Sequence, residues 1–296
     1  MHSMKAACRL TGLSPDTLRA WERRYGAVQP KRDANGRRLY EAAEVVRLRL
    51  LRQAVDLGQP IHRVARLSTV ELETLLRDAR EREPAEGLSV VATRLLDAVA
   101  NYRPDLCDEI LGLAIAGLSP RDAVHFVLSP ALFQAGSRWH DGEFSAAQEH
   151  LLTASVERLV MTTLHTFQKS ARGPSMVFGT LAGERHAIGS LLAAFLAASQ
   201  GMRCIYLGAD LPPIELAQAA VRSGSAVVVL SLVTATRSLE KQLQELCREL
   251  PSEIGVWLGG AATQDLQQAS LPEKCTRLSS FDDFLERAQI LRETGS

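Results

Sequence analysis

The chain has 296 residues, of which 46% are hydrophobic, 23% charged and 5% aromatic, and this composition excludes a disordered or fibrous protein. No apolar run is long enough for a membrane span, and the first residues lack the apolar core of a signal peptide. We therefore expect a cytoplasmic protein of two or three domains with no membrane partner.

Charge is distributed unevenly along the chain, although the net charge is zero. Residues 1–80 hold 16 Lys and Arg against 9 Asp and Glu, whereas the remainder holds 18 against 25. A basic head on an acidic body predicts that the head meets a polyanion.

The cysteines favour reduced thiols. Five are scattered without any Cys-x-x-Cys spacing, which argues against a zinc site and against a disulfide framework. They are Cys8, Cys107, Cys204, Cys247 and Cys275.

The first 67 residues are predicted to form short helices and one basic hairpin. Ser14 as an N-cap and Pro15 at the first helical position predict a helix start, and Gly26 predicts the end of that helix. A tight turn at Asn35-Gly36 predicts the hairpin. The expected helices cover residues 4–10, 15–25, 41–57 and 60–67, and the hairpin covers residues 30–40.

This stretch resembles the MerR-type winged helix-turn-helix. The resemblance rests on Gly12-Leu-Ser14, on Leu18-Arg-Ala-Trp-Glu-Arg-Arg-Tyr-Gly26 and on Gly36-Arg-Arg-Leu-Tyr40. It implies that the second helix enters the major groove of double-stranded operator DNA while the hairpin wing grips the backbone, with salt-dependent affinity. The DNA-binding candidates are Arg19, Arg23, Arg24, Tyr25, Lys31, Arg32, Arg37 and Arg38.

Two features qualify that candidate set. Leu18, Trp21 and Tyr25 recur at helical spacing, so Trp21 and Tyr25 favour core packing over DNA contact. The alternative for the arginines is a solvated basic face.

Residues 69–83 are predicted to form a short charged helix that stops at Pro84. Many MerR-type regulators continue here into one long dimerisation helix. A segment this short cannot form an extended coiled coil. We therefore expect self-association to depend on the C-terminal body.

Residues 86–170 are predicted to form an antiparallel four-helix bundle, because amphipathic segments are separated by short breaks. Ser145 is the expected N-cap of the last helix. The third helix runs toward Trp139 and His140. The expected helices cover residues 88–102, 104–116, 120–133 and 146–168.

From residue 174 onward apolar strands alternate with helices, which predicts a parallel doubly wound sheet of the flavodoxin-like (Rossmann-like) class. Ligands of such sheets bind beyond the carboxyl ends of the strands. The expected strands cover residues 176–181, 202–207, 226–232, 255–258 and 275–278, followed by a helix over 281–292. The fold class is thus an α winged helix-turn-helix (1–80), a four-helix bundle (86–170) and an α/β domain (174–296).

Four loops at that edge carry the ligand-binding candidates. Glu184-x-His186-x-x-Gly189 is expected after the first strand and Asp210 after the second. Ser231 with Val233 or Thr234 ends the third, and Gly259-Gly260 ends the fourth. A flavin or phosphate loop is the alternative for the glycine pair, while no Gly-x-Gly-x-x-Gly fingerprint follows the first strand.

These loops resemble cobalamin-binding domains, which show the same elements in the same order. The resemblance implies that His186 ligates cobalt from the lower face and that Glu184 fixes its tautomer. It implies that Ser231 bonds the buried dimethylbenzimidazole and that the glycine pair lets the nucleotide tail pass. Asp210 is a neighbour of the same ligand.

A Trp139-x9-Glu149-His150 motif in the bundle resembles the CarH/LitR group of light-dependent repressors. The resemblance implies that Trp139 packs against the adenosyl group of adenosylcobalamin, that Glu149 bonds it, and that His150 lines the same cavity. It implies that His140 becomes the upper cobalt ligand after light. Ala146 is smaller than the residue usual in the group, which leaves the upper ligand open.

The resemblance therefore predicts a transcription repressor, not an enzyme. It would bind DNA in the dark as an oligomer stabilised by adenosylcobalamin, a tetramer with a dimer as the alternative, and would leave DNA when light cleaves the cofactor. One alternative is a cobalamin or bilin sensor without this photochemistry. Others are a corrinoid carrier for methyl transfer, which has no use for the DNA-binding head, and a scaffold that has lost its cofactor.

Overall fold

The computed structural model describes residues 1–32, 36, 38–56, 59, 61–82, 87–234, 238–264, 266 and 271–294. The chain divides into two compact units. One comprises Met1–Asn101 with His125–Glu149, and the other comprises Tyr102–Val124 with His150–Ser296. None of the helices described is both long and apolar enough to cross a membrane.

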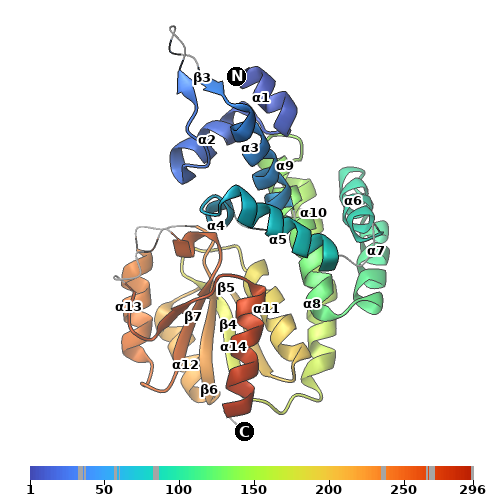
Figure 1. Cartoon of the computed structure of the whole chain (residues 1–296). Coiled ribbons are helices and arrows are strands. Elements are labelled where there is room, and N and C mark those ends of the chain that lie inside the picture. The colour runs from blue at the N-terminus through green and yellow to red at the C-terminus, as the bar shows by residue number, and fades with distance from the viewer. Residues whose placement is uncertain are drawn as a thin grey trace. The chain divides into compact units, whose positions relative to one another are not determined.

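The N-terminal head is a set of short helices with a small antiparallel sheet of order β1-β3-β2 (Figure 1). Its core is formed by apolar side chains from its helices and from β3, among them Leu18, Leu48 and Tyr40. Its elements are β1 (His2–Ser3), α1 (Met4–Thr11), α2 (Pro15–Tyr25), β2 (Lys31–Arg32), β3 (Arg38–Tyr40), α3 (Ala42–Asp56), α4 (Ile61–Val64) and α5 (Thr69–Arg82).

Local signals set the bounds of α2. The Ser14 hydroxyl accepts a hydrogen bond from the Thr17 backbone N–H at 3.1 Å, and Pro15 occupies the first turn. Gly26 ends the helix with a φ of 60°, a left-handed conformation that glycine adopts without strain. The predicted helix is confirmed at both ends. Most of the predicted turn of the wing, including Asn35, lies outside the described residues.

The helical region, residues 87–168, has four helical stretches, as the sequence predicts. Its elements are α6 (Gly87–Ala100), α7 (Pro104–Gly117), α8 (Pro120–Asp122) continued by a π-helical turn η1 (Ala123–Leu128) and α9 (Ser129–His140), and α10 (Ala146–Gln168). Ser145 and Gln148 form a reciprocal cap at the start of α10, with N–H to side-chain distances of 3.3 and 2.8 Å.

The third stretch is longer than predicted. The sequence predicts its end at Phe133, whereas α9 continues to His140. Gly136 lies inside the helix, and the left-handed residue that follows the helix is Gly142, with a φ of 77°. Trp139 and His140 are therefore the last residues of a helix rather than parts of a loop.

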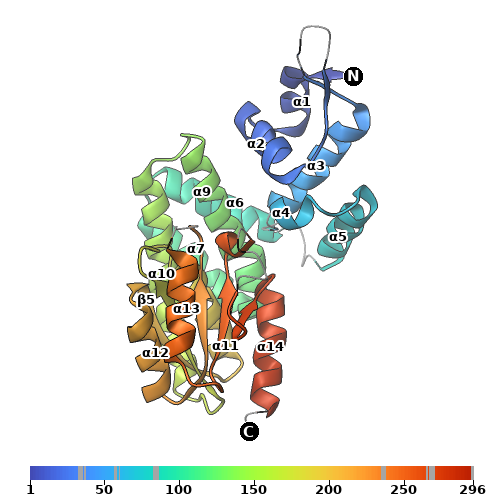
Figure 2. The same ribbon diagram turned by 90° about the vertical axis from the view of Figure 1, so that its left-hand side faces the viewer.

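The C-terminal domain is a parallel five-stranded sheet of order β5-β4-β6-β7-β8, which confirms the predicted doubly wound class. The strands are β4 (Ser175–Leu181), β5 (Arg203–Leu211), β6 (Ser225–Ser231), β7 (Gly255–Gly259) and β8 (Cys275–Arg277). Figures 1 and 2 show α11 (Ile188–Ser199) and α14 (Phe281–Thr294) on one face, and α12 (Pro213–Arg222) and α13 (Leu239–Glu249) on the other.

Burial explains why α11 is apolar on all sides. Every residue from Ser190 to Ala198 is buried, because the helix lies between the sheet and further helices of the same unit. On its outer side the ring of Phe195 meets that of Phe167 in α10, with centroids 5.8 Å apart.

One prediction about the sheet is wrong in detail. Asp210 is predicted to follow the second strand, but β5 extends through it to Leu211. The pairing of β4 with β5 shifts register on either side of Gly179, and this irregularity allows Leu181 to pair with Leu211. At this irregular end of β5 the backbone of Asp210 adopts a positive φ of 63°.

Candidate functional site

The strand order places a topological switch point at the carboxyl edge of the sheet, between β4 and β6. The chain runs from β4 to β5 on one side, and then crosses to β6 on the other side of β4. At such a switch point the loops after the two central strands diverge and leave room for a ligand. The loop after β4 carries Glu184 and His186, and the segment after β6 carries Val233 and Thr234.

Glu184 joins these two segments. Its side chain is buried, with 3% of the residue surface exposed. Oε1 accepts the backbone N–H of His186 at 2.9 Å and lies 2.5 Å from Nδ1 of the same residue. Oε2 accepts the backbone N–H groups of Val233 at 2.9 Å and Thr234 at 2.6 Å. One carboxylate thus satisfies donors on both sides of the switch point.

These hydrogen bonds keep Glu184 ionised. Burial by itself raises the pKa of the carboxyl, but hydrogen bonds from His186, Thr234 and Val233 outweigh it and hold the pKa below its usual value. An ionised carboxylate accepts hydrogen bonds only, so the neutral imidazole carries its proton on Nδ1. The lone pair of Nε2 then remains available on a side chain that is 62% exposed. This is the arrangement of a metal-ligating histidine.

Thr180 and Asp210 form hydrogen bonds with the backbone of the loop that carries Glu184. The buried Thr180 hydroxyl donates to the Glu184 carbonyl at 2.5 Å and accepts the Asp210 backbone N–H at 2.9 Å. Asp210 Oδ1 accepts the Gly183 N–H at 2.7 Å. Sequence reasoning missed Thr180, although a hydroxyl near the end of an otherwise apolar strand is a usable signal.

Two glycines let segments approach closely at this edge. A Cβ at Gly189 would lie 2.6 Å from the Ser231 hydroxyl, and a Cβ at Gly260 would lie 2.4 Å from the Leu232 carbonyl oxygen. Gly260 also has a φ of 99°, which side chains rarely adopt. Gly259 differs, because a Cβ there would meet only Leu278 at 3.9 Å. Close packing against Leu232 therefore requires a glycine at position 260, whereas the backbone at position 259 has room for a small side chain.

The close approach of Gly189 to Ser231 gives a testable expectation. Gly189→Ala should lower the free energy of unfolding by about 1–2 kcal/mol, because the new methyl group overlaps the Ser231 hydroxyl. Combining it with Ser231→Ala should restore most of the loss, since the Ser231 Cβ stands 3.5 Å away. Urea denaturation of the two single variants and the double variant measures the coupling. Strictly additive effects would contradict this geometry.

The other predicted cofactor residues lie on the helical region. Trp139 and His140 end α9, and Trp139 is 53% exposed. Glu149 and His150 lie in the first turns of α10. Trp139, His140 and Glu149 belong to one compact unit, whereas His150 belongs to the same unit as His186.

The predicted DNA-contacting residues of α2 differ in their surroundings. Arg23 and Arg24 are exposed on the last turn. Arg19 is exposed and pairs with Asp16 at 2.9 Å. Tyr25 is half-buried and packs against the core of the head, as its place in the apolar stripe predicts.

On the wing, Arg38 is held by the head itself. Its Nε lies 2.7 and 3.0 Å from the two carboxylate oxygens of Glu22, so it ties β3 to α2. Lys31 is exposed and pairs with Glu41 at 2.7 Å. Arg32 is exposed and donates to the Gly36 carbonyl at 3.1 Å. Arg37 lies outside the described residues.

Comparison with known proteins places these parts in one family. Residues 2–69 match the MerR HTH family of regulatory proteins, and residues 91–162 and 174–282 match two B12 binding domain families. The HTH-type transcriptional repressor CarH of Myxococcus xanthus is 31% identical over 285 residues, which cover 94% of this chain and 93% of CarH. The chain belongs to the CarH-type family of MerR regulators with B12 binding domains.

A second repressor is similar to this CarH-type chain in sequence, and one solved structure shares the fold of its C-terminal part. The repressor CarA of Myxococcus xanthus is 28% identical, with 85% of each chain covered. The monomethylamine corrinoid protein of Methanosarcina barkeri has the same fold over 66% of this chain and 94% of its own, with a TM-score of 0.53 and 18% identity. The CarH-type chain is thus a B12-binding transcriptional repressor with a DNA-binding head.

The residues at the switch point fit a cobalamin. His186 offers an exposed imidazole nitrogen, and a buried carboxylate orients the ring. There is no room for a side chain at Gly189 or Gly260, so the segments after β4, β6 and β7 approach one another closely at the switch point.

Proposed function

We propose that this CarH-type repressor responds to light through adenosylcobalamin. The observation that supports this most directly is His186, exposed at the switch point and oriented by Glu184, on a chain that also carries Trp139-x9-Glu149-His150 and a MerR-type head. In the dark the chain would bind operator DNA as an oligomer, and illumination would release it.

Each proposed site residue has a separate task. His186 would bind the cobalt of the cofactor, and Glu184 and Asp210 hold the loop that carries it. The residues that would hold the nucleotide tail are Gly189, Ser231, Val233, Thr234, Gly259 and Gly260. When bound, adenosylcobalamin supplies a cobalt–carbon bond that light can break. Trp139 would provide an exposed apolar face for the adenosyl group, Glu149 and His150 would contact that group, and His140 would bind the cobalt after light.

Self-association would couple the cofactor to DNA. The post-wing helix α5 has only 14 residues, too few for an extended coiled coil, so the regions after residue 86 are the proposed contacts between copies. We infer a tetramer, with the head at 1–80, the helical domain at 86–170 and the sheet domain at 174–296. Several heads on one operator bind far more tightly than one, so dissociation of the oligomer lowers DNA affinity without any change in the head.

The test is an absorption spectrum with size-exclusion chromatography on protein loaded with adenosylcobalamin in the dark and then illuminated. We expect a bound corrin spectrum that changes on illumination while a large oligomer becomes smaller. Trp139→Ala should bind cobalamin and lose the light-dependent change in size. Phe133→Ala, which removes another exposed aromatic residue of α9, is the matched control and should behave like the natural chain.

The same experiment addresses the alternatives. Bound cobalamin with no light-dependent change in size would indicate a cobalamin sensor without photochemistry. A chain that binds a bilin and no cobalamin would be another kind of sensor. The trimethylamine corrinoid protein 1 of Methanosarcina mazei is 22% identical over 59% of this chain. Methyl transfer is nevertheless the weaker proposal, because a DNA-binding head has no part in it.

Arg23 and Arg24 give a prediction for DNA binding. Replacing both by alanine should lower affinity for an operator fragment at least tenfold, because both exposed cations lie on the helix proposed to enter the major groove. If both contact phosphates, the slope of log affinity against log salt should fall by about 2. Fluorescence anisotropy at several salt concentrations measures both quantities.

The control is Arg222→Ala, which removes an exposed arginine from α12 in the sheet domain. It should leave DNA affinity and the salt slope unchanged. Equal losses in the two proteins would mean that overall charge matters and that α2 does not read DNA.

A further inference from the structure

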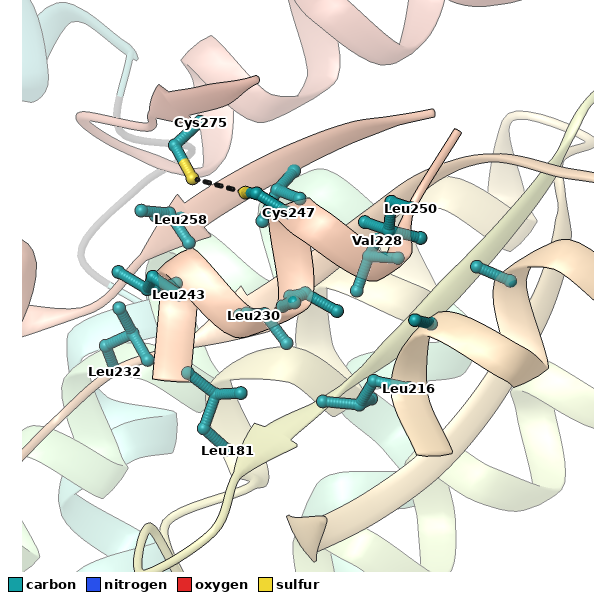
Figure 3. Packing of buried hydrophobic residues seen from close by; sticks show 14 of the residues in the cluster. Leu181, Leu216, Val228, Leu230, Leu232, Leu243, Cys247, Leu250, Leu258 and Cys275 are labelled. Atoms are coloured by element: carbon teal, nitrogen blue, oxygen red, sulfur yellow. Dashed lines mark hydrogen bonds between the residues drawn. The ribbon is translucent and has the colours of Figure 1, made fainter. Parts of the chain in front are cut away.

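Two cysteines that are far apart in sequence meet inside the sheet domain. Cys247 lies in the last turn of α13 and Cys275 is the first residue of β8. Their sulfur atoms are 3.5 Å apart (Figure 3). Both residues are buried, with exposed fractions of 9% and 6%. Apolar side chains surround the pair, including Leu243 and Leu258.

Of the two cysteines, Cys247 lines a depression in the protein surface. A shallow depression of about 420 Å³ lies over the end of α13. It is lined by Gln244, Cys247, Arg248, Leu271, Pro272, Glu273 and Lys274. Two cationic side chains therefore border the point at which a small polar solute could reach Cys247.

Lys274 is fixed beside Cys247 by the end of the helix. Its ammonium group donates to the backbone carbonyls of Cys247 and Pro251, each at 3.0 Å, and to that of Leu250. The cation thereby offsets the negative partial charge of the helix C-terminus, which would otherwise disfavour an anion there.

The two thiols are inequivalent as a result. A hydrogen bond from Cys275 and the charge of Lys274 lower the pKa of Cys247 despite its burial. The same hydrogen bond, together with burial, raises the pKa of Cys275. Cys247 therefore ionises first, and the Cys275 S–H stabilises its thiolate.

We propose that Cys247 and Cys275 form a dithiol that hydrogen peroxide oxidises to a disulfide, with Cys247 as the attacking residue and Cys275 as the resolving residue. The depression supplies access, and the contact between the two sulfurs supplies the second step. The alternative is that two cysteines simply fill the core as small apolar residues.

The chemistry balances with peroxide as the oxidant. The Cys247 thiolate attacks one peroxide oxygen, the O–O bond breaks, and the departing hydroxide takes up a proton to give water. The sulfur of Cys275 then attacks the sulfenic acid sulfur of Cys247, the S–O bond breaks, and the leaving hydroxide takes the Cys275 proton as a second water. Two thiols are oxidised and one peroxide is reduced. The sulfurs close from 3.5 Å to about 2.05 Å.

Peptide mapping of the full chain tests the proposal. The natural protein is treated with hydrogen peroxide, alkylated in denaturant and digested with trypsin without reduction. We expect a linked pair of peptides, Gln242–Arg248 with Cys275–Arg277, lighter by two hydrogens than the sum of the free peptides. The number of titratable thiols should fall from five to three, and dithiothreitol should restore five.

Variants separate the two roles. Cys275→Ser should stop at the sulfenic acid and become labelled by dimedone at Cys247, whereas Cys247→Ser should leave Cys275 unlabelled. Cys204→Ser is the matched control, because burial raises the pKa of the Cys204 thiol to about 12. Its thiol count should fall from four to two.

The mapping of the natural chain is decisive even if a variant fails to fold. The proposal is overturned if the folded protein keeps all five thiols in peroxide while the urea-unfolded chain oxidises. It is also overturned if oxidation links other cysteines and leaves these two free. Dimedone labelling of Cys275 in preference to Cys247 would reverse the assigned roles.

Discussion

His186→Ala should lower the affinity of the chain for cobalamin by about 100-fold, since the variant loses the proposed cobalt ligand. The fold should change little, because the side chain is 62% exposed and, within the described part of the chain, its polar contact is with Glu184 alone. The Glu184 carboxylate would keep three backbone donors, at residues 186, 233 and 234. We therefore expect the free energy of unfolding to stay within about 0.5 kcal/mol of that of the natural chain.

Titration with cobalamin followed by absorption measures this effect, and the spectrum also reports which base occupies the lower position. His165→Ala is the control, because His165 is an exposed histidine of α10 remote in sequence from the site. It should bind cobalamin like the natural chain. Equal affinity and equal spectra for His186→Ala and the control would remove His186 from the coordination scheme.

Gly260→Ala should have the largest effect on stability. The backbone at this position has a φ of 99°, and the new Cβ would lie 2.4 Å from the carbonyl oxygen of Leu232. That oxygen accepts the Ala262 N–H at 2.9 Å, while the Leu232 N–H donates to the Gly259 carbonyl at 2.8 Å. Relief of the overlap must therefore disrupt backbone hydrogen bonds. We expect a loss of about 3–5 kcal/mol in the free energy of unfolding.

Gly201→Ala isolates the steric part of this loss. Gly201 also has a positive φ, of 83°, but no heavy atom would lie within 4 Å of its Cβ. Its substitution should cost only about 1–2 kcal/mol for the left-handed backbone. Urea denaturation followed by circular dichroism compares the two. Similar losses would show that the contact with Leu232 relaxes easily and that backbone conformation alone requires Gly260.

Local signals in the sequence predicted elements best where a cap or a breaker marks their ends. Ser14, Pro15 and Gly26 set both ends of α2, and Ser145 starts α10 through its cap with Gln148. The apolar runs of β4 and β6 were also predicted to within one residue. Each of these features depends on neighbours a few positions away.

Elements whose length depends on distant partners were predicted less well. β5 reaches Leu211 because of a register irregularity with β4, which no local pattern reveals. The short strand β1 exists because His2 and Ser3 pair with Tyr40 and Leu39, and no local pattern at residues 2–3 predicts it. Both depend on residues that the fold brings together.

The same distinction holds at the candidate site. The partnership of Glu184 with His186 follows from a spacing of two residues and was expected. The second oxygen of Glu184 bonds residues 49 and 50 positions later, which requires the crossover from β5 to β6. Similarly, the contact of Gly189 with Ser231 becomes visible only once the sheet order is known.

The hydrogen bonds of Glu184 to the loops after β4 and β6 should also restrict the motion of these loops in the absence of a ligand. Three backbone N–H groups, those of His186, Val233 and Thr234, are held by one buried and ionised side chain. Their amide hydrogens should therefore exchange slowly with solvent in the cofactor-free protein, although they belong to loops. A loop that is already ordered loses little conformational entropy when it binds a ligand. We therefore expect the loop that carries His186 to bind its ligand with little rearrangement of the backbone.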